Sequence, residues 1–186
     1  MSTKTKALKV TEVVSYDIEI PSGVQFALEK GKIIAKGPAG QVERTFPSKN
    51  IDISVKENKV FIKTKDKSAD SRMIAGAFNS HIKNIISGTQ KPFTYKLKVT
   101  FTHFPMTVSV SGSEFSLTNF LGEKKPRKAK IPQGVKVSVQ GDSITVESPD
   151  LELAGRTATL IEQTTKIRAR DRRVFQDGIY IIQKPK

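Results

Sequence analysis

The stretch Ile53–Gly76, ISVKENKVFIKTKDKSADSRMIAG, contains two structural periods in succession. Its first half alternates apolar and polar residues on both sides of a short polar connection at Glu57 to Lys59, which predicts two paired strands. Its second half places apolar residues about every four positions, which is the period of an amphipathic helix. A strand pair followed by one helix predicts a small α+β layer.

The same plan recurs at Val137–Leu160, VSVQGDSITVESPDLELAGRTATL. A constant shift aligns four residue pairs: Val55 with Val139, Val60 with Ile144, Ile62 with Val146, and Arg72 with Arg156. Two copies indicate a duplication rather than a solenoid, which needs about three repeats or more. We therefore expect the α+β class, with two tandem duplicated domains that each pack a small, mainly antiparallel sheet against one main helix.

The expected domain boundary lies in the turn-rich segment Ser87–Phe93, which gives domains at residues 1–88 and 89–186. The alternating segment Tyr95–Phe101 reads as a strand that could close the first sheet or open the second. In the first copy, Gly37–Gly40 (GPAG) separates two strand-like runs and predicts a hairpin.

The first helix should begin at a cap supplied by Ser68, Asp70 or Ser71 and should end at Gly88 in a left-handed conformation. Its apolar stripe is expected to comprise Met73, Ile74, Ala77, Phe78, Ile82, Ile85 and Ile86. The second helix is expected over residues 151–170, with an inward stripe at Ala154, Ala158 and Ile161.

The chain has 186 residues, a formal net charge of +14 and 37% hydrophobic residues, which is globular composition. The absence of cysteine excludes a disulfide framework and thiolate metal sites, and it fits a reducing compartment. We find no secretory signal and no apolar run of about 18 residues, so we expect a soluble cytosolic protein without a membrane partner. The excess charge favours a polyanionic partner, although a merely basic soluble protein remains an alternative.

The two copies diverge most in charge, and function is expected where duplicated units differ. The short turn of the first hairpin becomes LGEKKPRKAKIP in the second copy, and the end of the second helix is followed by KIRARDRRVFQDG. The first group of cations is Lys124, Lys125, Arg127, Lys128 and Lys130. The second group is Lys166, Arg168, Arg170, Arg172 and Arg173.

Structural interpretations of these groups remain open. Cations at a helix C-terminus complement its dipole, but one or two would suffice, and a charged loop is often simply solvated. Phe175 and Tyr180 could stack on bases, as in many RNA-binding proteins, or could pack into the core. Charge alone does not separate RNA from DNA, so a general DNA-binding protein is the main rival.

The sequence offers little for catalysis. It has two histidines, His81 and His103, at no metal-ligand spacing, and it lacks a nucleophile elbow and a phosphate loop. We therefore expect no enzyme, no cofactor, no metal and no small-molecule substrate.

Several longer motifs resemble the universal large-subunit ribosomal protein family number six, in its archaeal/eukaryotic form. The most specific are NFLGEKKPRKAKIPQGV at Asn119–Val135 and ATLIEQTTKIRARDRRVFQDGIYI at Ala158–Ile181. AKGPAG (35–40), SHIKNIISG (80–88) and THFP (102–105) extend the resemblance over nearly the whole chain. The bacterial branch has a Gly-rich, Pro-containing segment at residues 168–178, so fine contacts should not be carried over from it.

The resemblance implies a structural protein of the large ribosomal subunit, located in the cytoplasm, whose second domain does most of the rRNA binding. It also implies a position near the sarcin-ricin loop and the docking region of translation factors, among neighbouring ribosomal proteins. We expect further contacts from Lys4, Lys6 and Lys9. The expected rRNA-binding residues are both groups of cations together with Arg156, Phe175, Asp177 and Gly178, where Asp177 and Gly178 form a turn and Gly178 is expected to need positive φ.

Overall fold

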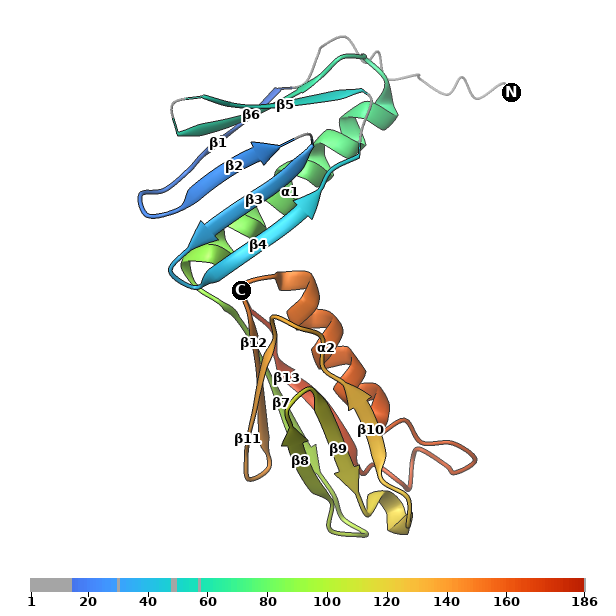
Figure 1. Ribbon diagram of the computed structural model, residues 1–186. Helices are drawn as coiled ribbons and strands as arrows, with labels where there is room; N and C mark the ends of the chain where they lie inside the picture. The colour runs from blue at the N-terminus through green and yellow to red at the C-terminus, as the bar shows by residue number, and fades with distance from the viewer. Residues whose placement is uncertain (1–14, 30, 48–49, 57, 186) are drawn as a thin grey trace, which may run out of the picture. The chain divides into compact units, whose positions relative to one another are not determined.

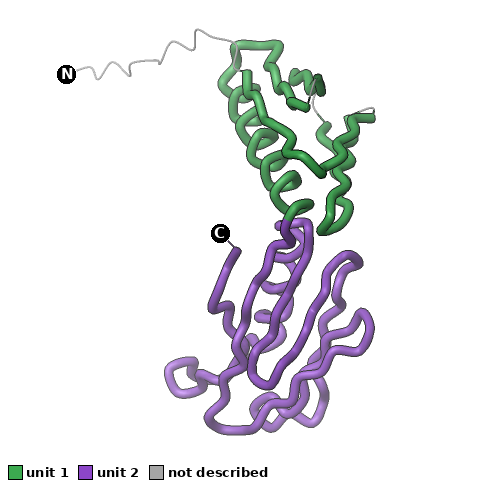
Figure 2. The backbone as a smooth tube through the Cα atoms, turned by 90° about the vertical axis from the view of Figure 1, so that its left-hand side faces the viewer, with its two compact units in different colours: residues 1–90 green, residues 91–186 purple. Residues whose placement is uncertain are grey.

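The computed structural model describes residues 15–29, 31–47, 50–56 and 58–185. The chain divides into two compact units, Met1–Gln90 and Lys91–Lys186, whereas the sequence placed the division after residue 88 (Figure 2). The expected Lys4, Lys6 and Lys9 contacts fall outside the described residues. Each unit is described separately below.

Unit 1 contains two three-stranded antiparallel sheets and one helix in its described ranges. The sheet orders are β1-β6-β5 and β2-β3-β4, and α1 packs against strands of both sheets (Figure 1). The elements are β1 (Ser15–Glu19), β2 (Gln25–Glu29), β3 (Lys32–Gly37), β4 (Gly40–Thr45), β5 (Ile51–Lys56), β6 (Lys59–Thr64) and α1 (Ala69–Gln90). The expected hairpin around residues 37–40 is thereby confirmed.

Unit 2 repeats this plan with one additional strand among its described residues. Its sheets have the orders β10-β9-β8 and β11-β12-β7-β13, and α2 packs against β7, β10, β12 and β13. The elements are β7 (Phe93–Thr100), β8 (Thr107–Ser111), β9 (Glu114–Thr118), the 3-10 turn η1 (Phe120–Gly122), β10 (Arg127–Lys130), β11 (Lys136–Gln140), β12 (Ser143–Ser148), α2 (Leu151–Thr164) and β13 (Gly178–Gln183). The strand around Tyr95 therefore belongs to the second unit.

The strand register demonstrates the duplication. Val55 lies opposite Val60 in unit 1, and the aligned residues Val139 and Ile144 lie opposite each other in unit 2. The expected α+β class with two tandem duplicated units is confirmed, with the detail that the strands of each unit form two sheets. β1 pairs with β6 as β7 pairs with β12, so β13 has no equivalent among the described strands of unit 1.

Each unit has its own apolar core because strand alternation and the helix stripe point inward together. In unit 2 the expected Ala154, Ala158 and Ile161 are buried. In unit 1 the expected stripe is partly wrong: Met73 and Ile74 are 65% and 41% exposed, and Ala77 is also exposed. The inward face instead begins at Ser71 and Ala75 and continues through Phe78 and Ile82.

A local cap sets the start of α1, and a tertiary contact supports its C-terminal end. Ser68 caps α1, since its Oγ accepts a hydrogen bond from the Asp70 N–H at 3.3 Å. The helix continues past Gly88, contrary to the expected end, because the Thr89 carbonyl accepts a bond from the Ala39 N–H at 2.9 Å and needs no glycine cap. The approach is close: a Cβ on Gly37 would lie 2.5 Å from the Thr89 carbonyl oxygen.

The expected extension of α2 to residue 170 is wrong, because the helix ends at Thr164. The hydroxyls of Thr164 and Thr165 donate to the carbonyls of Ile161 and Glu162 at 2.6 and 2.8 Å, which offers the last turn an alternative to further helix. Ala169 has a left-handed φ of 55°, which a continuous helix would not allow. The five cations from Lys166 to Arg173 therefore lie in a loop beyond α2 rather than on its last turn.

Candidate nucleic-acid interface

The loop of residues 165–177, called the arginine loop below, is closed at its base. The Thr165 hydroxyl donates to the Glu162 carbonyl and accepts a hydrogen bond from the Ile179 N–H at 3.1 Å. One side chain thus joins the end of α2 to the start of β13 across the whole loop. In Figure 1 the loop is the orange-red segment between these two elements.

Asp177 anchors the arginine loop to the connection between β7 and β8. Its side chain is only 1% exposed, and its carboxylate accepts bonds from the Thr102 N–H at 2.9 Å, the Thr102 hydroxyl at 2.8 Å and the His103 N–H at 3.2 Å. The His103 ring nitrogen Nδ1 lies 3.2 Å away. Burial alone would raise the pKa of Asp177, but the bonds from Thr102 and His103 outweigh it and lower the pKa to about 2.

Gly178 serves close packing, and the expected positive φ is wrong, because Gly178 is not among the glycines with left-handed φ. A Cβ at this position would lie 3.3 Å from the Thr165 hydroxyl oxygen and 3.3 Å from both the Cζ and the hydroxyl oxygen of Tyr180. Asp177 and Gly178 are both buried, so they position the loop rather than face a partner.

The tip of the loop is a tight turn around Asp171. The Asp171 carboxylate accepts a bond from the Arg173 N–H at 2.9 Å, and its carbonyl accepts bonds from the N–H groups of Val174 and Phe175. The turn leaves four guanidinium-bearing residues exposed, namely Arg168, Arg170, Arg172 and Arg173. Among the described residues, none of these four forms an ion pair with a carboxylate.

Phe175 lies half-buried at the side of the loop. Its ring lies against the His103 ring at a centroid distance of 4.9 Å, and the Arg170 guanidinium lies 4.8 Å above its centroid. This stack holds Arg170 over a fixed support. Of the two aromatic residues that could be core or base-stacking, Phe175 is partly packed and Tyr180 is 43% exposed.

Arg127 joins the two groups of cations. Its guanidinium binds both carboxylate oxygens of Glu123 at 2.6 and 2.8 Å, and it donates to the carbonyls of Thr164 and Lys166 at 2.7 and 3.0 Å. It also lies 4.3 Å above the buried ring of Phe120. Arg127 therefore ties the start of β10 to the end of α2 and supplies positive charge at that helix end, and four of its five N–H donors are occupied within the chain.

The pKa of the Glu123 carboxyl indicates that the two groups of cations lie close together. The hydrogen bonds from Arg127 are the largest cause and lower the pKa of Glu123. Burial opposes them, and the charges of Arg127 and Arg170 lower the pKa by smaller amounts. Because Arg170 belongs to the arginine loop, the field of one group reaches into the other. Arg127 of the first group also donates to the carbonyl of Lys166 in the second, and we call the two groups together the basic face.

The remaining predicted residues also lie in unit 2. Arg156 of α2 lines an open groove of about 930 Å³ together with Lys128 and Lys130 of β10. Lys128 pairs with Glu114 at 3.0 Å, whereas Lys124, Lys125 and Lys130 are exposed and form no ion pair among the described residues. The structure thus brings the loop arginines, the lysines and Arg156 into one unit.

Two exposed lysines of unit 2 were not among the residues predicted from the sequence. Lys96 and Lys98 lie exposed on β7, and Lys98 lies opposite Tyr180 of β13. The alternation of lysine with buried Leu97 and Val99 would have revealed them as outward positions of one strand.

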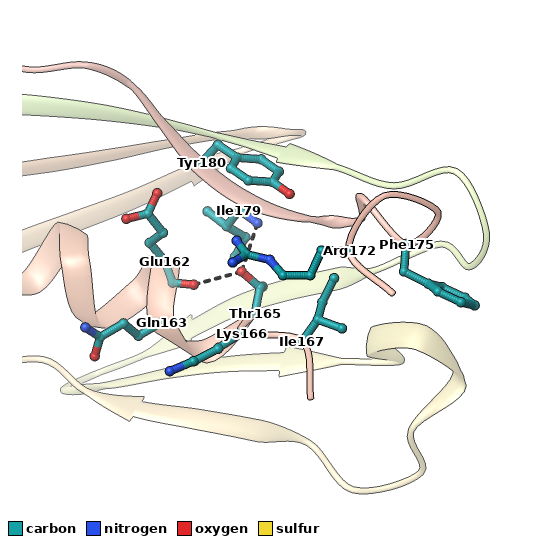
Figure 3. Close-up of a pocket in the computed structure, with 9 residues that line it drawn as sticks. All are labelled: Glu162, Gln163, Thr165, Lys166, Ile167, Arg172, Phe175, Ile179 and Tyr180. Atoms are coloured by element: carbon teal, nitrogen blue, oxygen red, sulfur yellow. Dashed lines mark hydrogen bonds between the residues drawn. The ribbon is translucent and has the colours of Figure 1, made fainter. Parts of the chain in front are cut away.

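A pocket of about 300 Å³ opens between the last turn of α2, the arginine loop and β13. Figure 3 shows Arg172 extending across it toward Thr165 and Ile179, with Tyr180 on one side and the Phe175 ring pointing away.

Neither metal nor membrane chemistry is visible in the described part of the chain. No three metal-binding side chains gather into a possible ion site within the described residues. Neither α1 nor α2 carries the sustained apolar stretch that crossing a bilayer would take.

Comparison with known proteins gives a consistent result. The family model described as "Ribosomal protein L6" matches the chain twice, at residues 20–91 and 104–178. The "Large ribosomal subunit protein uL6" of Methanosarcina mazei is 46% identical over 92% of this chain and 97% of the relative. The proteins of the same name from Sulfurisphaera tokodaii and Methanobrevibacter smithii are 46% and 41% identical, over 90% and 94% of this chain and 91% and 98% of their own lengths.

Proposed function

We propose a function from the premise that this chain belongs to the ribosomal protein L6 family. The protein is a structural constituent of the large ribosomal subunit and binds the rRNA of that subunit. Its place is then the ribosome, in the cytoplasm, among other ribosomal proteins. The names of the relatives are those of structural proteins, in agreement with the expectation that the chain is no enzyme.

We further propose that unit 2 supplies most of the binding, near the sarcin-ricin loop and the region where translation factors dock. The supporting observation is the convergence of both groups of cations on the basic face. In unit 1, Lys32, Lys59 and Lys65 pair with carboxylates of their own chain, and in unit 2 Arg127 and Lys128 do so as well, whereas the four loop arginines form no ion pair among the described residues. Positive charge without an internal partner is what phosphate neutralisation requires.

The construction of the basic face suits a folded RNA. Thr165 and Asp177 fix the two ends of the arginine loop, and Arg127 joins β10 to the end of α2 beside it. The exposed arginines are therefore attached to a rigid part of the fold. Phosphate contacts carry no sequence information, so selectivity arises from the spacing of RNA strands that this rigid surface matches.

Crosslinking in cells, followed by sequencing of the attached RNA, tests the proposal. We expect large-subunit rRNA around the sarcin-ricin loop to be recovered, with crosslinked peptides from the arginine loop and from residues 124–130. Recovery mainly from messenger RNA or from DNA would refute the ribosomal assignment. Recovery of the right rRNA through peptides of unit 1 would refute the division of labour between the units.

A further inference from the structure

The pocket beside Tyr180 is too small to accept a nucleic-acid duplex and large enough for one planar group. Its volume of about 300 Å³ lies at the lower end of small-ligand pockets. Its floor includes the apolar side chains of Ile167 and Ile179. Because the arginine loop forms one wall, any group that enters this pocket lies beside the cations of the basic face.

Tyr180 supplies a fixed aromatic surface. Its hydroxyl donates to the Gln176 carbonyl at 2.8 Å, and the hydroxyl end of the ring lies over Gly178, where no side chain intervenes. The residue is nevertheless 43% exposed. A ring that is already held in place loses little conformational entropy when a base stacks on it, and such stacking is worth about 1–3 kcal/mol per base.

The polar groups of the pocket match a nucleotide. Lys166 and Arg172 are exposed and form no ion pair among the described residues, so they can neutralise a phosphate. Glu162 and Gln163 also line the pocket, from the last turn of α2, and Figure 3 shows Gln163 beside Lys166. A carboxylate and an amide there can accept from and donate to the edge of a base, whereas a second phosphate would be repelled by Glu162.

We propose that this pocket takes up a single unpaired nucleotide of the bound RNA, with its base stacked on Tyr180 and its phosphate on Arg172 and Lys166. This inference rests on the proposed RNA-binding function and adds a specific contact to it. An apolar side chain of a neighbouring protein would fill the floor but would leave both cations without a partner, so the nucleotide is the better match.

Two RNA hairpins that differ only in one bulged adenosine provide the test, each titrated with the full chain at fixed salt. We expect the bulged hairpin to bind about tenfold more tightly, which is the lower part of the range for one stacked base. Tyr180→Leu should abolish this preference and leave the affinity for the paired hairpin unchanged. Tyr180→Phe keeps the ring without the hydroxyl, and we expect it to retain the preference.

A matched control is Phe104→Leu, because Phe104 is also 43% exposed in unit 2 but does not line the pocket. We expect it to preserve the preference for the bulge. A second readout replaces the bulged adenosine with 2-aminopurine, whose fluorescence should be quenched on binding to the unmodified chain and to Tyr180→Phe but not to Tyr180→Leu.

The outcomes separate this inference from the function on which it rests. Equal, salt-dependent binding of both hairpins by the unmodified chain would overturn the nucleotide pocket and leave RNA binding intact. A bulge preference that survives in Tyr180→Leu would also overturn it. Failure of both hairpins and of large-subunit rRNA to bind better than duplex DNA would overturn the proposed rRNA binding itself.

Discussion

The Asp177 anchor allows a quantitative prediction for the variant Asp177→Asn. Lowering the pKa from 3.8 to about 2 corresponds to about 2–3 kcal/mol of stability when the carboxylate is charged. The hydrogen bonds that Asp177→Asn would lose give a similar loss of stability. An amide keeps one acceptor oxygen and turns its NH2 group toward the His103 N–H or the Thr102 donors, which leaves at least one buried donor unpaired at a cost of about 1–3 kcal/mol.

The sign of the pH dependence follows from the direction of the shift. The pKa of Asp177 is lower in the folded state than in the unfolded state, so its contribution is fully present above about pH 5 and is lost as the pH falls through 3.8 toward about 2. We expect Asp177→Asn to be about 2 kcal/mol less stable at pH 7 and to approach the unmodified chain in stability near pH 2.

Denaturant unfolding of the full chain, followed by amide resonances of β7 and β13, measures this effect in unit 2 separately from unit 1. Asp142→Asn is the matched control, because the Asp142 side chain is exposed at a strand turn. The reasoning would be refuted if Asp177→Asn matched the unmodified chain at pH 7, or if its deficit stayed constant down to pH 2.

Three further perturbations address the basic face. Replacing Arg168, Arg170 and Arg173 together by alanine should make the slope of log affinity against log salt shallower by about two to three, measured on large-subunit rRNA; an unchanged slope would exclude the loop as the contact. Arg127→Lys loses the bidentate and carbonyl contacts, so we expect a loss of roughly 1–3 kcal/mol in stability with little change in that slope; a drop in slope without a stability loss would assign Arg127 to the RNA instead. Gly178→Ala forces a Cβ to 3.3 Å from Thr165 and Tyr180, so thermal denaturation should show about 1–2 kcal/mol of destabilisation, and an unaltered midpoint would contradict the packing argument.

The repeat was predictable because strand pairing reads directly from alternation. Val55 and Val139 were aligned from sequence, and both face the expected partner across a hairpin. The family was also predictable, because the motifs around Asn119 and Ala158 are long and specific, and the family model confirms it.

The C-terminal end of α1 was not predictable, because it depends on a tertiary contact, whereas Ser68 was among the caps expected from sequence. Gly88 has the character of a helix terminator, yet an N–H from a distant hairpin turn satisfies the Thr89 carbonyl. Met73 and Ile74 look apolar enough for the core, yet the stripe is set by where the sheets lie, and Ser71 and Ala75 occupy the inward positions.

The role of Arg127 was also not predictable from the sequence, because its contacts are tertiary. A run of cations in sequence gives no information on which of them is committed to the chain's own carbonyls and carboxylates. That these cations contact rRNA stays a prediction. The structure separates the residues that hold the surface in place, Arg127 and Asp177, from the cations exposed on that surface.

The pairing of β13 with β7 has a consequence for timing during synthesis. Asp177 bonds to Thr102, 75 positions earlier in the chain, and β13 is aligned along β7. A growing polypeptide that has emerged only as far as the arginines therefore carries their charge without the frame that spaces them. Selective binding to RNA should begin only after β13 has emerged and paired with β7. Incomplete chains should therefore not bind RNA selectively.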